Sequence, residues 1–193
     1  MRDRGGARRP GGVVALAALA GIALVALVIG PAGTAGARGG GCPNRLAEAH
    51  SVSLDKLRQA ITCLVRHKRH QRGLGRLHAN HDLRRAANKH TDVMLRKNCF
   101  KHNCPGEPGL GRRIRRTGYL DGAKHFAYAE NLGYARTPKE MLDVWMDSRF
   151  DRGNILSRTY DDFGVGAGWG SPKHGVPNRG WETYTIVFAH RRR

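Results

Sequence analysis

A histidine between two cysteines is the first feature of the sequence that could do chemistry. Cys99, His102 and Cys104 lie within six residues, and thiolate and imidazole groups at short spacing are typical zinc ligands. A structural zinc site needs four such ligands, and the sequence has no second cysteine-rich segment to complete a tetrahedron. The competing use of the two thiols is a disulfide bond, which leaves the histidine available for another role.

The four cysteines of the chain are even in number and permit three pairings. We favour Cys42 with Cys63 and Cys99 with Cys104. At about 100° per residue, the apolar residues between positions 54 and 65 share one face of a helix, and Cys63 falls on the opposite side. An N-terminal segment that crosses this outer face could present Cys42 to it. Outside the cytosol, oxidation of such pairs is the default.

The first residues of the chain have the order of features found in an export signal. Several arginines precede an uncharged apolar stretch from Val13 to Ile29, and a small-residue cleavage pattern follows at Ala35-Gly36-Ala37. We therefore expect residues 1–37 to be a signal peptide and the mature chain to begin at Arg38 and to be secreted. The alternative is an uncleaved membrane anchor, because the apolar run is just long enough to span a bilayer.

The chain is strongly basic, with 34 Lys and Arg against 15 Asp and Glu and a formal net charge of +19. Such a field attracts polyanions and anionic surfaces and does not determine the fold. We expect an envelope polymer or a lipid headgroup as partner, and the alternative is that the basic clusters are only solvated helix faces. Nucleic acid is disfavoured because no aromatic-interleaved stripe or docking motif accompanies the clusters. The expected binding residues are Arg66, Lys68, Arg69, Arg72, Arg112, Arg113, Arg115 and Arg116.

Three helices are predicted before residue 120. Ser53 is a plausible N-cap for the first, which Gly73 closes. The second is expected between about Asn80 and Asn98, with His90 in the middle of its apolar stripe. His90 could be a core histidine satisfied by one hydrogen bond, or it could line a cavity. A short third helix is expected from about residue 110 to 117.

A capping box and several strands are predicted in the second half of the chain. Thr137-Pro138-Lys139-Glu140 is typical of a helix start, with threonine as the cap and proline at the first helical position. The residues of that helix expected to face inward are Met141, Val144, Trp145 and Ser148. Strands are expected over residues 126–132, 163–169 and 183–188. Helices clustered early and strands clustered late fit an α+β domain.

Six short motifs occur in register between Asn98 and Phe188. They are Phe100-Lys101-His102, Ala129-Glu130-Asn131-Leu132-Gly133, Val144-Trp145-Met146-Asp147-Ser148, Arg152-Gly153-Asn154-Ile155-Leu156, Phe163-Gly164-Val165-Gly166 and Tyr184-Thr185-Ile186-Val187-Phe188. Together they resemble the CAP superfamily (cysteine-rich secretory, antigen 5 and pathogenesis-related 1 proteins), in its bacterial SCP-like extracellular branch. The resemblance implies an α-β-α sandwich, with a small antiparallel sheet between helical layers. The CAP-like domain would cover residues 54–193, after an N-terminal strap at 38–53.

The same resemblance implies a set of site residues. In this family a cleft over the sheet collects two histidines and two acidic residues, in some members around a divalent metal. His102 and Glu130 match the first histidine and the first acid. The second histidine of bacterial members corresponds to Asp151, the histidine of the animal and plant pattern to Thr183, and the second acid to Ser148. One histidine and one glutamate of the set are therefore retained.

The residues at these positions could act in several ways. His102, Glu130 and Asp151 could bind a divalent metal weakly, and two carboxylates would favour a harder ion than zinc. They could also relay a proton, with the glutamate orienting the imidazole. Ser148 could face the same region, but nothing around it resembles a nucleophile elbow. The alternative is that His102 and Glu130 hydrogen-bond to each other and pin two loops across the cleft.

Two functions follow from these observations. The favoured one is a secreted, non-enzymatic module that binds an envelope or surface component, either a lipid or an anionic polymer, and requires no cofactor. It follows from the export signal, the positive charge and the loss of half of the family's site residues. The alternative is a divalent-metal-dependent hydrolase that acts on peptide or cell-wall substrates.

Overall fold

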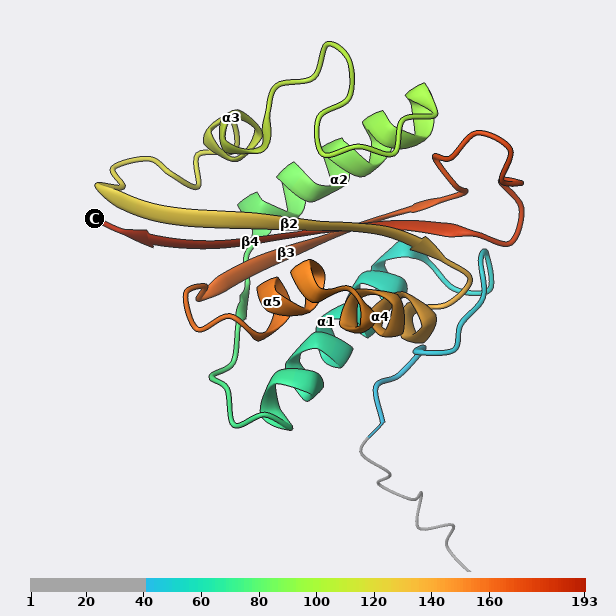
Figure 1. The fold of residues 1–193 in the computed structure, drawn as a ribbon, viewed down its shortest axis with the longest axis horizontal. Helices are drawn as coiled ribbons and strands as arrows, with labels where there is room; N and C mark the ends of the chain where they lie inside the picture. Colours follow the sequence, from blue (N-terminus) through green and yellow to red (C-terminus); the bar gives the residue numbers. More distant parts are fainter. Residues whose placement is uncertain (1–40) are drawn as a thin grey trace, which may run out of the picture. The chain divides into compact units, whose positions relative to one another are not determined.

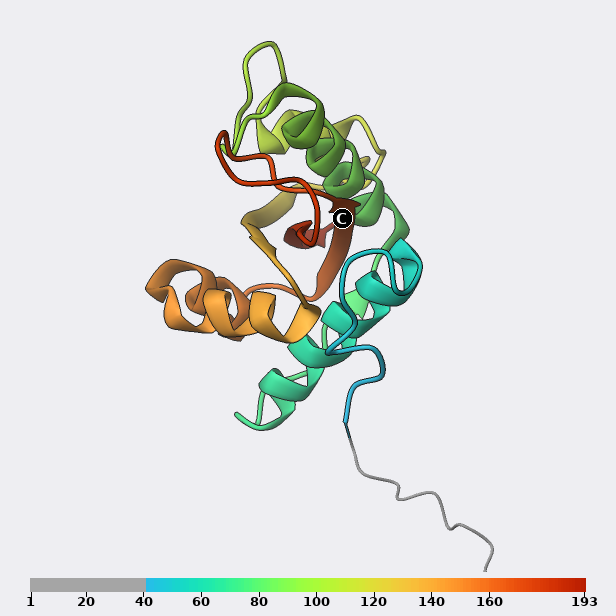
Figure 2. The ribbon, with the colours of Figure 1, turned by 90° about the vertical axis from the view of Figure 1, so that its right-hand side faces the viewer.

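A computed structural model describes residues 41–193, so the predicted signal peptide and the first residues of the strap lie outside the described part of the chain. Figure 1 shows a sheet with α2 (His81–Lys97) and α3 (Leu110–Arg115) on one face. The other face is covered by α1 (Leu54–His70), α4 (Pro138–Asp147) and α5 (Arg149–Leu156). Figure 2 shows the same layers after a quarter turn. The predicted α-β-α sandwich is confirmed.

The sheet has four strands in the order β1-β3-β4-β2. Strands β2 (His125–Ala135) and β3 (Asp162–Trp169) both pair antiparallel with the central β4 (Glu182–Arg192). The two-residue strand β1 (His78–Ala79), which the sequence did not predict, pairs parallel with β3. Strand β2 therefore forms one edge of the sheet over eleven residues.

Alternation along β4 separates the two cores of the domain. Tyr184, Ile186 and Phe188 lie in the larger cluster with side chains of α1, α4 and α5. Val187 and Ala189 point the other way and pack with residues of α2 and α3. Because successive strand residues face opposite sides, one strand contributes to both cores.

Three glycines of β3 allow α2 to lie directly on the strand. A Cβ atom at Gly164 would be 2.1 Å from the backbone nitrogen of Arg84, and one at Gly166 would be 2.6 Å from the carbonyl carbon of Ala87. A Cβ at Gly168 would meet the Leu95 side chain at 2.6 Å. Glycine within a strand marks a close backbone approach, and here the approach is that of the helix that carries His90.

Local capping signals place the helices as predicted. The Ser53 hydroxyl accepts from the Lys56 amide at 3.4 Å, and Thr137 accepts from the Glu140 amide at 3.2 Å. Glu140 reaches back one residue further than a capping box requires and accepts from the Arg136 amide at 3.0 Å. Ser148 ends α4 and caps α5, a helix that the sequence did not predict.

One inward-facing prediction for α4 is wrong. Val144 is 49% exposed, whereas Met141 and Trp145 are fully buried. The buried arc of α4 is centred near Leu142 and Trp145, and Val144 lies about 100° away from that centre at the helical repeat. The side chain of Val144 therefore points to solvent.

The strap after residue 41 is fastened to the domain at several points. Cys42 is disulfide-bonded to Cys63 on α1, and Cys99 is bonded to Cys104, so the predicted pairing is confirmed. The Lys139 amide at the start of α4 donates to the Arg45 carbonyl at 2.8 Å. His50 stacks on Trp169 with ring centroids 4.4 Å apart.

Candidate functional site

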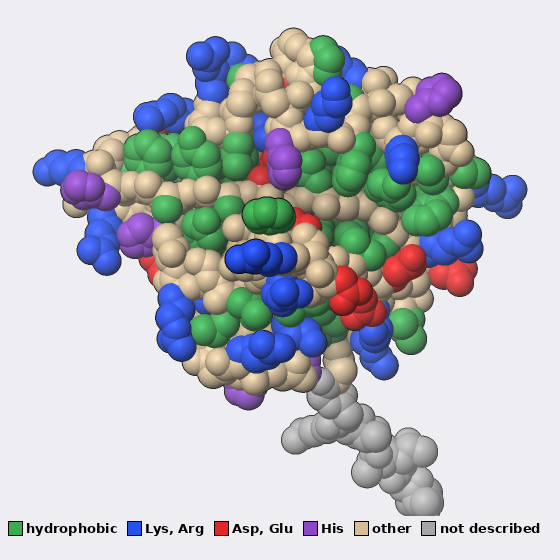
Figure 3. Space-filling view, viewed as in Figure 1, with side chains coloured by type: hydrophobic (Ala, Val, Ile, Leu, Met, Phe, Trp, Pro, Cys, Tyr) green, Lys and Arg blue, Asp and Glu red, His purple; other side chains and the backbone are tan. Residues whose placement is uncertain are grey.

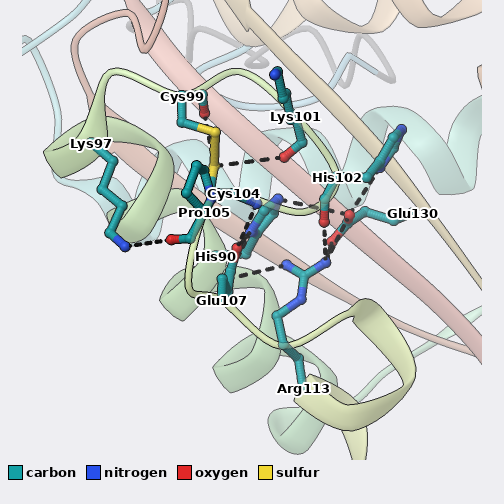
Figure 4. The surroundings of a disulfide bond; sticks show 10 residues. All are labelled: His90, Lys97, Cys99, Lys101, His102, Cys104, Pro105, Glu107, Arg113 and Glu130. Carbon is teal, nitrogen blue, oxygen red and sulfur yellow. Dashed lines mark hydrogen bonds and ion pairs between the residues drawn. A yellow bond between two sulfur atoms is a disulfide. The ribbon is translucent and has the colours of Figure 1, made fainter.

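His102 lies against Glu130 beside the edge strand β2. Its Nδ1 atom is 3.0 Å from Oε1 of Glu130, so the two residues that the family resemblance singles out are in hydrogen-bond contact (Figure 4). The Glu130 side chain is 1% exposed and that of His102 is 67% exposed. The imidazole therefore covers a buried carboxylate and presents its other edge to solvent.

The loop that carries His102 is held by local features of the sequence. Asn98 takes a left-handed conformation with φ of 45°, which ends α2. The disulfide between Cys99 and Cys104 then closes a short loop around His102. Both cysteines pack in a small cluster with Met94 of α2. These contacts direct the histidine over β2.

The buried carboxylate of Glu130 is bound by Arg113 of α3. Nη2 of Arg113 donates to both carboxylate oxygens of Glu130 at 3.0 Å and to the His102 carbonyl at 3.0 Å. An unpaired carboxylate in this position would be strongly destabilising. The assignment of Arg113 to an anionic surface is therefore wrong, because its guanidinium is buried and occupied by an internal ion pair.

A second histidine and a second glutamate lie beside Glu130 and Arg113 and complete a cluster with them. Nδ1 of His90 is 2.8 Å from Oε2 of Glu107, and Nε2 of His90 is 3.8 Å from Oε1 of Glu130. Nη1 of Arg113 lies 3.7 Å from Oε1 of Glu107. His90 is thus a buried histidine with one strong partner, and it also belongs to the site.

Glu107 is a residue of this cluster that the sequence analysis did not single out. It comes from the turn after Cys104, and its carboxylate is 3.5 Å from the Cys104 amide. One signal could have found it, because Glu107 is the only acidic residue between positions 99 and 120, a segment rich in arginine. An isolated acid among basic residues favours an ion pair over a solvated side chain.

Ser148 and Asp151 lie at the start of α5, on the face of the sheet opposite to α2 and α3 (Figure 1). The Ser148 hydroxyl accepts from the Asp151 amide at 3.3 Å, which makes it a helix cap. The Asp151 carbonyl accepts from the Asn131 side chain at 3.0 Å, and Asn154 donates to Asn131 at 2.8 Å. The two asparagines therefore form the scaffold that ties α5 to the edge strand.

Asp151 acts on His102 through charge. The hydrogen bond to Glu130 raises the pKa of His102 above its ordinary value, and the charges of Glu130 and Asp151 add to the effect, while burial and Arg113 oppose it. Burial raises the pKa of Asp151 itself, with the Ser148 hydrogen bond and the His102 charge opposing. Within residues 41–193 no hydrogen bond or ion pair joins Asp151 to either His102 or Glu130.

Thr183, at the position of the family's other histidine, is buried and donates to the Gly170 carbonyl at 2.7 Å. It supplies no ligand to the cleft.

The arrangement does not suit a divalent metal held by His102, Glu130 and Asp151. Both Glu130 oxygens already accept from Arg113, whose positive charge would repel a second cation at the same place. In the part of the chain that the structure describes, no three His, Cys, Asp or Glu side chains are grouped to hold a metal ion. We therefore derive no chemistry through a metal, and metal titration of the wild-type protein decides whether these three residues bind one.

A second candidate site lies on the outer face of α1. This cavity of about 640 Å³, here called the α1 groove, has four basic or imidazole side chains in its wall, and none of its described lining residues is acidic. Burial and the like charge of Arg76 lower the pKa of Arg66. The groove is lined by Gln59, Thr62, Cys63, Arg66, His67, His70, Leu74 and Arg76.

The remaining basic residues differ in whether they can reach a ligand. Arg69 is 3% exposed, and its guanidinium donates to the carbonyls of Gly75, Ile155 and Ser157 at 2.9, 2.8 and 2.7 Å. Its assignment to an anionic surface is wrong, because these bonds tie α1 to α5 and to the loop after α1. The other predicted surface residues, Arg66, Lys68, Arg72, Arg112, Arg115 and Arg116, are partly or fully exposed.

Hydrophobic side chains gather in a band along β2, with Lys and Arg side chains above and below it (Figure 3). Phe126 and Tyr128 stack at 6.0 Å between ring centroids, and Arg115 of α3 lies over Phe126 at 5.2 Å.

No helix within residues 41–193 is long and apolar enough to cross a membrane.

Comparison with known proteins matches most of the chain to one protein family. Residues 56–185 match the family described as CAP, the cysteine-rich secretory protein family. No curated protein matches the chain.

Three solved bacterial structures share the fold. An outer surface protein of Borrelia burgdorferi is 12% identical, with a TM-score of 0.61 over 75% of this chain and 99% of that one. An extracellular SCP-domain protein of Bacillus anthracis is 23% identical, with a TM-score of 0.55 over 71% of this chain and 43% of that one. A cysteine-rich secretory protein of Staphylococcus aureus is 18% identical, with a TM-score of 0.50 over 72% of this chain and 40% of that one.

The chain therefore spans almost all of the first protein and less than half of the other two. The family match covers nearly all of the five helices, strands β1 to β3, the first residues of β4 and the loop that carries His102. This chain belongs to the CAP family of cysteine-rich secretory proteins.

Proposed function

We propose that this protein is a secreted, non-enzymatic CAP module that binds an anionic component of a cell envelope. The protein would recognise the phosphate or carboxylate groups of that component. The observation that carries the proposal is the α1 groove, in which Arg66, Arg76, His67 and His70 line one cavity without an acidic neighbour among its described lining residues. Two like charges held close together favour an anion between them.

The chemistry of the groove is suited to an oxyanion. Arg66 is fixed by a bond from Nε to the Leu77 carbonyl at 3.1 Å and by its position over the Phe163 ring at 5.6 Å. Its two terminal nitrogens therefore keep donors for a ligand, and a guanidinium matches phosphate or carboxylate in shape. Thr62 and Gln59 add neutral hydrogen-bonding groups to the same wall.

A second basic surface strengthens the attraction. Arg112, Arg115 and Arg116 are exposed on and after α3. Without residues 1–37, which hold four arginines and one aspartate, the mature chain keeps a formal charge of +16, and this charge adds a long-range field. The predicted export signal and the similarity to an outer surface protein and an extracellular protein support a location where such envelope components occur.

Binding to vesicles and polymers tests the proposal. We expect the purified mature protein to bind vesicles that contain phosphatidylglycerol, or a soluble phosphodiester polymer, and to ignore phosphatidylcholine vesicles and neutral dextran. Between about 0.1 and 1 M salt the Debye length falls from about 10 to about 3 Å, so most of this binding should be lost.

Charge reversal locates the site. Arg76→Glu in the groove should weaken binding several-fold more than Lys173→Glu, which makes the same charge change in an exposed loop. His102→Ala should leave binding unchanged. Equal effects of the two reversals, or binding lost in His102→Ala, would contradict the proposal. So would tighter binding to single-stranded DNA than to a phosphodiester polymer without nucleobases.

A further inference from the structure

Arg113 lies among four side chains of the kinds that bind metal ions. His90 comes from α2, His102 and Glu107 from the loop after it, and Glu130 from β2 (Figure 4). Two imidazoles and two carboxylates are a common ligand set for divalent ions in proteins. The guanidinium of Arg113 contacts both carboxylates of this set, at 3.0 and 3.7 Å.

The cluster is built around a positive charge. His90, Glu107, Glu130 and Arg113 each have a side chain at most 6% exposed. Two carboxylates at this depth would repel each other and bear a large desolvation cost without a cation between them. The guanidinium supplies that cation, and its fork donates from Nη2 to both oxygens of Glu130.

We propose that the guanidinium of Arg113 is the fixed cation of this cleft and takes the place of a divalent metal ion. Because the arginine is part of the chain, the positive charge cannot dissociate or be removed by a chelator. The cluster is thereby assembled without metal, and the imidazole of His102 makes its side-chain hydrogen bond with the Glu130 carboxylate that Arg113 holds.

The guanidinium leaves part of the ligand capacity unused. Nε2 of His90 and the Nε and Nη1 atoms of Arg113 are buried without a hydrogen-bond partner among the described residues. Removal of the guanidinium would therefore free both Glu130 oxygens, one of which lies 3.8 Å from Nε2 of His90, while Glu107 keeps its contact with Nδ1 of His90. A small divalent ion could enter the space left by the guanidinium, with His102 as a further ligand.

Metal titration of wild-type and variant proteins tests this proposal. We expect the wild-type protein, in chelator-free buffer, to bind no stoichiometric Zn²⁺, Mn²⁺ or Co²⁺, and its melting temperature to be unaffected by these ions or by EDTA. Arg113→Met replaces the guanidinium with a neutral, flexible side chain. This variant should gain one bound metal ion per chain and a melting temperature that rises on metal addition.

Two further variants control for surface and ligand effects. Arg112→Met removes the exposed arginine next in the chain and should gain no metal. The double variant Arg113→Met, His90→Gln should lose the metal that the single variant gains. The Co²⁺ absorption spectrum reports whether histidine nitrogen is bound, independently of any activity.

Two outcomes would overturn the proposal. One is tight 1:1 metal binding by the wild-type protein that is lost in Glu130→Gln. The other is a folded Arg113→Met variant that binds no metal. If Arg113→Met fails to fold without metal, folding rescued by Zn²⁺ supports the proposal. If it fails under both conditions, the titration of the wild-type protein decides.

Discussion

Glu182 is a carboxylic acid buried on the side of β4 that faces α1 and α4. Burial raises its pKa to about 7, with a hydrogen bond from the Tyr184 hydroxyl opposing the shift. Its other oxygen, Oε1, has no partner in the described residues. The folded protein therefore favours the neutral acid at mildly acidic pH.

This burial predicts a pH dependence of stability. A pKa that is higher in the folded state than in the unfolded state stabilises the protein below the unfolded value, and the gain is lost as pH rises through about 7. Glu182→Gln should abolish this loss and stabilise the protein at pH 8 by roughly 2 to 3 kcal/mol. Urea unfolding at pH 5 and pH 8 measures it, with exposed Asp92→Asn as the control. An unchanged pH profile in Glu182→Gln would show that this acid is not the cause.

His102 is expected to respond to its two acidic neighbours in a fixed order. Because the hydrogen bond that His102 donates to Glu130 is the largest cause of its raised pKa, Glu130→Gln should lower that pKa more than Asp151→Asn does. The raised value also means that His102 contributes stability at acidic pH that is lost as pH rises through the folded pKa. NMR titration of the ring protons measures both shifts. A larger effect of Asp151→Asn would contradict the geometry of the pair.

The residue scale is also where prediction from sequence was least complete. The pair His102 and Glu130 follows from motif positions, but the partners Arg113 and Glu107 do not. Arg113 belongs to a run of arginines on a six-residue helix, too short for periodicity to tell which member points inward. The burial of Arg69 was missed for a different reason. Two of the carbonyl groups that bind its guanidinium come from segments distant in sequence.

At the scale of elements, the contact between α2 and β3 predicts an asymmetry between two glycines. Gly166→Ala should destabilise the protein by about 1 to 3 kcal/mol or more, because the new methyl group meets the backbone of α2. Gly153→Ala, in α5, has open space around the new Cβ and should stabilise by about 0.5 to 1 kcal/mol. Denaturant midpoints of the two variants test the pair. Equal effects would mean that the strand and the helix are not in direct contact.

Elements with strong local signals were predicted well, and those set by distant contacts were not. Ser53, Thr137 and Asn98 mark helix ends by side-chain chemistry that needs no tertiary structure. Helix α5 lacks an apolar stripe and is fixed by Asn131 of β2. The two residues of β1 are a strand only because Asp162 and Phe163 lie beside them.

At the scale of the whole molecule, we predict that the exported protein begins at Arg38 and contains no free thiol. The cleavage pattern at Ala35-Gly36-Ala37 and the two disulfides within residues 41–193 are the reasons. Intact mass before and after alkylation of the unreduced protein tests both parts. Retention of Met1 would contradict the first part, and alkylated cysteines would contradict the second.

The fold of the whole molecule was more predictable than its chemistry. Six motifs in register identify the layers because each one places a buried residue or a turn, such as Trp145 or Asn131. The cleft depends on which polar side chains meet across layers. That information lies in the packing of α3 on β2, which a motif does not encode.

The two disulfides join cysteines that are neighbours in order along the chain, with sequence separations of 21 and 5. A chain that crosses a membrane from its N-terminus would expose Cys42 and Cys63 before either later cysteine has emerged. Each thiol would then meet its native partner first, and the mispaired forms that permit reshuffling would seldom arise. For an exported chain, the order of the cysteines along the sequence would therefore favour the native pairs over mispaired ones.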